Sequence, residues 1–135
     1  MIMKLTGDCK KEFEKWYFKN HVQTTKKFKE LYPHEYKDIF GWFYGISASF
    51  KYGVYVDYFD SIKIHVDIHP LLDYNNEAYT NVISYIIIVI ELNKKEELNR
   101  EDLEVKSRQE ARNQAILKAN EIRNEQLKQK LLKNN

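Results

Sequence analysis

Cysteine, proline and glycine are all scarce in this sequence of 135 residues, which contains one, two and four of them respectively. Because Cys9 is alone, the chain offers no partner for an internal disulfide and no cysteine set for a zinc or iron–sulfur site. The low proline and glycine content excludes collagen-like and low-complexity chains. Aromatic residues make up 14% of the sequence, enough for the core of a single domain over residues 1–135.

Long hydrophobic runs are also missing. The longest, from Val82 to Ile90, is roughly half of the ~20 residues that a membrane-spanning helix needs. The N-terminal residues lack the continuous apolar stretch of a secretory signal. We therefore expect a cytoplasmic protein without a membrane partner.

The net charge of +2 is small, but the charges are unevenly distributed. Residues 1–49 contain nine Lys or Arg and six Asp or Glu, residues 50–103 contain five and ten, and residues 104–135 contain eight and four. Basic ends therefore flank an acidic middle. A net negative middle opposes phosphate groups, so nucleic acid is not the favoured partner.

Hydrophobic spacing predicts helices at both ends of the chain. Residues 8–32 place apolar side chains at steps of three, four and seven, which is typical of an amphipathic helix, and a short helix is expected over residues 35–44. The helical period returns from Ser107, where Ser107 and Glu110 match a capping box. We expect residues 126–135 at the basic end to fray.

Three stretches between these helices predict strands. Residues 52–59 alternate in character, as do residues 62–69, whose isoleucines and valine would face inward until Pro70 ends the strand. Residues 82–92 are apolar on both faces, as in a strand covered on both sides by helices or by another subunit. Loops are expected over 71–81 and 93–104. The predicted fold class is α+β, a three-stranded antiparallel meander with N- and C-terminal helices on one face, in the order α-β-β-β-α.

The predicted strands place aromatic, histidine and carboxylate side chains on one side of the sheet, a combination that favours a recognition surface. Imidazole and carboxylate are also zinc ligands, so a metal-dependent enzyme is a second alternative. No further ligand from a known motif accompanies them, and we therefore predict no catalytic residue, no metal and no cofactor. The six predicted binding residues are Tyr55, Asp57, Phe59, His65, Asp67 and His69.

The segment KSRQEARNQAILKA, from Lys106 to Ala119, together with the α-β-β-β-α order, resembles the last helix of a double-stranded-RNA-binding domain. The resemblance implies phosphate contacts by Lys106, Arg108 and Arg112. The long loop between the first two strands of that family is replaced here by a short acidic turn. Binding of double-stranded RNA or DNA through the basic helices is the first alternative function.

Two separate blocks resemble an uncharacterised family of small phage or mobile-element proteins of Bacteroidetes-type bacteria. They are YGVYVDYFDSIKIHVDI, from Tyr52 to Ile68, and SRQEARNQAILKANEIRN, from Ser107 to Asn124. The resemblance implies a source rather than an activity. With no catalytic set in the sequence, we predict a small non-catalytic interaction protein that binds a host protein, with residues 82–92 as a surface for a homodimer.

Overall fold

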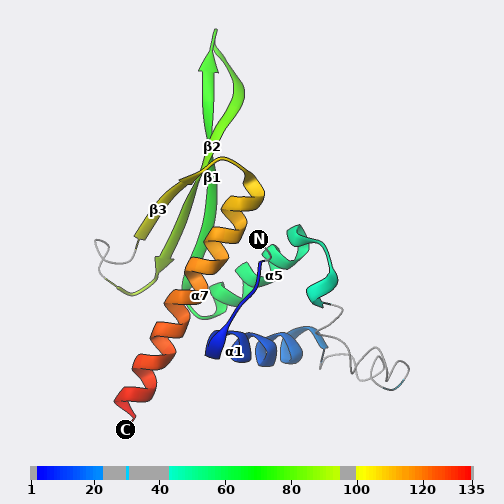
Figure 1. Ribbon diagram of the computed structural model, residues 1–135, viewed down its shortest axis with the longest axis vertical. Coiled ribbons are helices and arrows are strands. Elements are labelled where there is room, and N and C mark those ends of the chain that lie inside the picture. The colour runs from blue at the N-terminus through cyan, green and yellow to red at the C-terminus, as the bar shows by residue number, and fades with distance from the viewer. Residues whose placement is uncertain (1–2, 23–29, 31–42, 95–99, 135) are drawn as a thin grey trace.

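The structure is a computed structural model that describes residues 3–22, 30, 43–94 and 100–134. A three-stranded antiparallel sheet in the order β1-β2-β3 packs against α-helices that also contact one another (Figure 1). The predicted α+β class and the α-β-β-β-α order are confirmed. The elements are α1 (Gly7–Tyr17), the π-helix η1 (Phe18–Val22), α5 (Ala48–Ser61), β1 (Ile64–Asn75), β2 (Ala78–Glu91), β3 (Arg100–Val105) and α7 (Arg108–Lys133).

The N-terminal helix is held against α7 by side-chain amides. Thr6 occupies the N-cap position of α1 without a capping hydrogen bond from its own side chain. Asn124 of α7 instead accepts a hydrogen bond from the Cys9 N–H at 2.8 Å, which satisfies a donor of the first turn. Gly7 has φ +64°, and a Cβ there would lie 3.0 Å from the Asn124 amide, so glycine permits this close approach.

The two N-terminal helix predictions are only partly covered by the described residues. The helix expected over 8–32 is confirmed for residues 8–22, where α1 passes into η1. Its remainder lies outside the described residues apart from residue 30, which is helical. Most of the second helix, expected over 35–44, also lies outside them.

Aromatic rings from three parts of the chain form the centre of the core. Phe13 of α1 is fully buried, and its ring centroid lies 5.4 Å from Phe43, 5.0 Å from Tyr55 and 5.4 Å from Tyr58. Such edge-to-face and tilted pairs add to the gain from burial. On the other side of the core, α7 contributes the small buried residues Ala111, Ala115 and Ala119, which let the helix axis lie close to the sheet.

The prediction of a strand over residues 52–59 is wrong, because these residues belong to α5. Almost every residue of YGVYVDYF is apolar, so the alternation that suggested a strand fits a helical period equally well. The helix buries Val54, Tyr55, Tyr58 and Phe59 at helical spacing against the aromatic core. Tertiary burial therefore overrides the local β-propensity of the tyrosines and valines.

The two faces of the sheet differ in burial. Along β1, Ile64 and Val66 are buried, and their Cα partners on β2 are Glu91 and Val89. The alternate residue His65 is exposed and pairs with Ile90. The predicted inward and outward alternation of this strand is confirmed, with the helices on the face that carries Ile64 and Val66.

The strands are longer and differently placed than predicted. Residues 71–81, expected as a loop, form the distal part of a hairpin between β1 and β2. Pro70 does not end β1 but lies within it, opposite Tyr85. Proline is tolerated there because β1 is an edge strand of the described sheet. The third strand is β3 and not the segment 52–59, and all of β3 except its last residue, Val105, falls in the expected loop 93–104.

The C-terminal helix begins as predicted. The Ser107 hydroxyl accepts a hydrogen bond from the Glu110 N–H at 3.1 Å, which confirms the predicted N-cap. Residues 126–133, which we expected to fray, continue α7 as far as Lys133. Among the described residues, no helix is both long and apolar enough to cross a membrane.

Candidate functional site

An apolar row runs along the face of the sheet that lies opposite the helices. Ile86, Ile88 and Ile90 are partly exposed, whereas Ile87 and Val89 between them are buried on the helix side. The antiparallel register places these isoleucines beside His69, Asp67 and His65 of β1 respectively. We call these six residues, His65, Asp67, His69, Ile86, Ile88 and Ile90, the open face.

Polar groups border the row of isoleucines on both sides. On β1, His69 Nε2 lies 3.0 Å from Asp67 Oδ2, and Asp67 Oδ1 accepts a hydrogen bond from the Ile68 N–H at 2.8 Å. On the β3 side, the Ser84 hydroxyl donates to Glu104 at 2.9 Å. An apolar centre with a polar border is the composition of a protein-binding surface.

The predicted binding residues do not form one surface. Tyr55 and Phe59 are fully buried in α5, so the prediction that they share an exposed face with the β1 residues is wrong. Asp57 is exposed on α5. Only His65, Asp67 and His69 share the expected outer face, because they alone lie on a strand.

The open face does not complete a metal site with the residues that the structure describes. Across residues 3–22, 30, 43–94 and 100–134, no group of three or more His, Cys, Asp or Glu side chains could hold a metal ion. Residues two apart on a strand are about 6.5–7 Å apart, which leaves His65 and His69 far from each other. The imidazole of His69 pairs with Asp67 instead.

The basic residues proposed for nucleic-acid contact are largely held against the protein itself. The guanidinium of Arg108 lies 5.6 Å from the ring centroid of Tyr85, within cation–π distance. Arg112 lies 5.4 Å from the Tyr52 ring centroid and donates to the Ser49 hydroxyl at 2.9 Å. Lys106, between β3 and α7, is exposed.

The distal part of the β1–β2 hairpin extends well beyond the helices (Figure 1). We call residues 70–83 the arm. Its two turn residues, Asn76 and Glu77, have φ values of 51° and 63°, as in the type I′ turns of two-residue hairpins. A left-handed conformation costs a non-glycine residue roughly 1–2 kcal/mol, so Glu77 stands where glycine would be more stable.

Large apolar side chains are exposed on the arm. Tyr74 and Tyr79 face each other across the strands with ring centroids 5.1 Å apart, and they are 59% and 71% exposed. The sequence signal for this hairpin is Asn76, a residue type that tolerates the left-handed conformation, between two short runs rich in Leu, Tyr, Thr and Val. The prediction of a loop over 71–81 did not use this signal. The exposed apolar residues of the arm are Leu72, Tyr74, Tyr79, Val82 and Ile83.

A partly buried polar cluster joins α1, α5 and α7. Glu12 of α1 accepts two hydrogen bonds from Arg123 of α7, at 2.8 and 2.7 Å, and a third from the Tyr58 hydroxyl of α5 at 2.7 Å. Burial alone would raise the pKa of Glu12, but the hydrogen bonds from Arg123 and Tyr58 outweigh it and lower that pKa. Burial raises the pKa of the Cys9 thiol, 3.8 Å from Tyr58, to about 12. The cluster is a helix clamp, with its thiol held in the inert protonated form.

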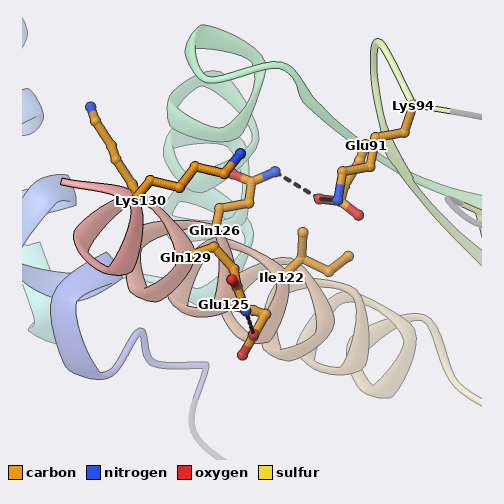
Figure 2. A pocket seen from close by; sticks show the side chains of 8 residues that line it. Glu91, Lys94, Ile122, Glu125, Gln126, Gln129 and Lys130 are labelled. Carbon is orange, nitrogen blue, oxygen red and sulfur yellow. Dashed lines mark hydrogen bonds and ion pairs between the residues drawn. The ribbon is translucent and has the colours of Figure 1, made fainter. Parts of the chain in front are cut away.

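A shallow cavity of about 410 Å³ lies between the end of β2 and the C-terminal half of α7 (Figure 2). Its polar groups bond to one another, because Gln126 donates to Glu91 at 2.8 Å and Gln129 donates to Glu125 at 2.8 Å. Two glutamates and three lysines line it, so the lining favours no single ligand charge. The lining residues are Glu91, Lys94, Ile122, Glu125, Gln126, Gln129, Lys130 and Lys133.

Comparisons with models of known protein families, with curated proteins and with solved structures gave no significant match.

Proposed function

We propose that this protein is a small non-catalytic interaction protein that binds another protein through its open face. The observation that carries the proposal is the row of Ile86, Ile88 and Ile90, partly exposed on the face of the sheet opposite the helices. The burial of such an apolar row by a partner is favourable, because it removes apolar surface from water. The polar residues on either side would fix the orientation of that partner.

A protein fits this surface better than a nucleic acid does. From Ile64 to Asn93 the sequence contains no Lys or Arg and four acidic residues, so the hairpin carries negative charge. Phosphate groups would be repelled, whereas protein interfaces combine an apolar centre with a polar rim. The likeness to phage and mobile-element proteins of Bacteroidetes-type bacteria supports a host protein as the partner.

A comparison of three baits tests the proposal. The immobilised wild-type protein, Ile88→Asn and the matched control Phe50→Asn would each be exposed to lysate of a Bacteroidetes-type bacterium. Phe50 is 55% exposed on α5, whereas the open face lies on β1 and β2, so its substitution changes an apolar surface outside the sheet. Bound proteins would be quantified by mass spectrometry.

We expect a protein captured by the wild type and by Phe50→Asn to be lost from Ile88→Asn. A captured protein should then bind the purified wild-type chain directly, as measured by calorimetry. Equal capture by all three baits would contradict the proposal, because the open face would then contribute nothing to binding.

A further inference from the structure

The two ends of the molecule carry complementary unpaired surfaces. The arm projects from one end of the long axis, and the C-terminal end of α7 projects from the other (Figure 1). From Lys128 to Lys133 every residue of α7 is exposed, and Leu131 and Leu132 are 58% and 60% exposed. We call residues 127–133 the helix end.

The apolar face of the arm continues the face of the sheet that the helices cover. The hairpin has two register shifts in this stretch, and both insert their extra residue on β2, so side chains still alternate along β1. Leu72 and Tyr74 therefore lie on the same side of β1 as Ile64, Val66 and Ile68, which pack in the core. Their partners across the hairpin are Val82 and Tyr79. Nearer the centre of the molecule α7 covers this face, whereas the arm extends beyond it. The arm is thus a sheet surface without a helix.

The helix end is the reverse case, a helix surface without a sheet. Leu131 and Leu132 lie three and four residues after Lys128, so the three side chains form one patch on α7. The earlier turns of the same helix already pack on the sheet through Ala111 and Ala115. Packing the helix end on an arm would repeat the contact that builds the core.

Charge complementarity favours the helix end as the surface that packs on the arm. The arm carries Asp73 and Glu77 with no basic residue, and the helix end carries Lys128, Lys130 and Lys133 with no acidic residue. Contact between two arms would instead bring like charges together, which is unfavourable. A second copy of the chain therefore supplies a surface of the right shape and of the opposite charge.

We propose that two copies of this chain form a closed dimer in which the helix end of each copy covers the apolar face of the other copy's arm. Because arm and helix end lie at opposite ends of the long axis, a two-fold axis across that long axis makes both contacts at once. A specific interface buries at least about 1,200 Å² in total, so each of the two contacts needs about half of that area. The open face takes no part in this dimer.

Charge reversal tests the dimer in trans. The arm variant is Asp73→Lys with Glu77→Lys, and the helix-end variant is Lys128→Glu with Lys133→Glu. The matched control, Asp57→Lys with Asp60→Lys, changes the net charge as the arm variant does but on exposed positions of α5. Circular dichroism would verify that each variant is folded, and sedimentation velocity would measure its mass against the 16.3 kDa chain.

We expect a dimer for the wild type and the control, and a monomer for the arm variant and for the helix-end variant. An equimolar mixture of those two variants should regain the dimer, because each then presents opposite charge to the other at both contacts. A second, charge-neutral variant, Leu131→Ser with Leu132→Ser, changes only exposed side chains and should weaken the dimer more than about tenfold.

Four results would overturn the proposal. They are a wild type that stays monomeric up to its solubility limit, single variants that remain dimeric, a mixture that stays monomeric, and open-ended growth of the wild type with concentration. None of these results bears on the open face, whose test is partner capture by Ile88→Asn. The two proposals therefore fail separately.

Discussion

Ile88 and Val89 are neighbours on β2 whose side chains point to opposite faces of the sheet, and the same substitution at each position tests the open face directly. Val89 is 1% exposed beneath the helices, whereas Ile88 is partly exposed on the open face. We consider Val89→Asn and Ile88→Asn. Asparagine adds no charge, so the two variants differ chiefly in how deeply the amide is buried.

The structure predicts different losses of unfolding free energy for the two substitutions. Full burial of a valine side chain contributes about 1.5–3 kcal/mol, and an amide buried without a hydrogen bond costs a further ~1–3 kcal/mol. Val89→Asn should therefore lower the free energy of unfolding by about 2.5–6 kcal/mol. At Ile88 the amide reaches water, so the loss is limited to partial burial and β-propensity, about 1–2 kcal/mol.

Urea unfolding followed by far-ultraviolet circular dichroism measures both values. With a typical slope of about 2 kcal/mol per molar urea, the midpoint should fall by about 2 M for Val89→Asn and by less than about 1 M for Ile88→Asn. A fall for Ile88→Asn as large as that for Val89→Asn would refute the reasoning. The row of isoleucines would then be covered, and the sheet would have no open face.

Three further predictions concern the helix layer. Phe13→Ala should lower the free energy of unfolding, measured in urea, by about 3–5 kcal/mol because the Phe13 ring is fully buried. Phe50→Ala, at a 55% exposed position, should lower it by less than about 1 kcal/mol. Similar losses of stability in the two variants would contradict the aromatic core. The pKa of Glu12 is lowered in the folded state, so its contribution to stability is complete above its unfolded pKa and is lost as the pH falls through the folded value. The unfolding free energies of Glu12→Gln and the wild type should therefore differ more near pH 7 than near pH 3. A difference that does not change with pH would be inconsistent with the ion pair between Glu12 and Arg123. The pKa of Cys9 is raised to about 12, so the folded state should lose stability as the pH rises above about 9. Because the thiol is buried and protonated, a thiol reagent should label Cys9 only in urea. Rapid labelling of the folded chain would contradict the burial of this thiol.

Part of the architecture could be predicted because local pattern and final burial agree. In α1, Cys9, Phe13 and Tyr17 repeat at steps of four, and all three are buried. The alternation from Ile64 to His69 gives the correct two faces of β1, since only a strand separates such residues cleanly. The capping box at Ser107 marks the start of α7 to within one residue.

The predictions failed where local pattern was ambiguous. In residues 52–59 nearly all positions are apolar, so both periods fit, and the aromatic core contributed by Phe13 and Phe43 decides for a helix. The same error made the predicted site wrong, because Tyr55 and Phe59, which were expected on an exposed surface, are buried in the core. In β3 the charged sequence REDLEV has little β-propensity, and pairing with β2 decides its structure.

The sequence by itself determined the α+β class, the terminal helices and the outward placement of His65, Asp67 and His69, because periodicity and capping act within a few residues along the chain. Only the tertiary structure decided which face of β2 remains uncovered and how far the hairpin reaches beyond the helices. Residues 82–92 are apolar on both sides, and nothing in their order shows that helices cover one side alone. That asymmetry depends on the number and length of the helices that pack against the sheet, which are contacts between residues distant in the chain.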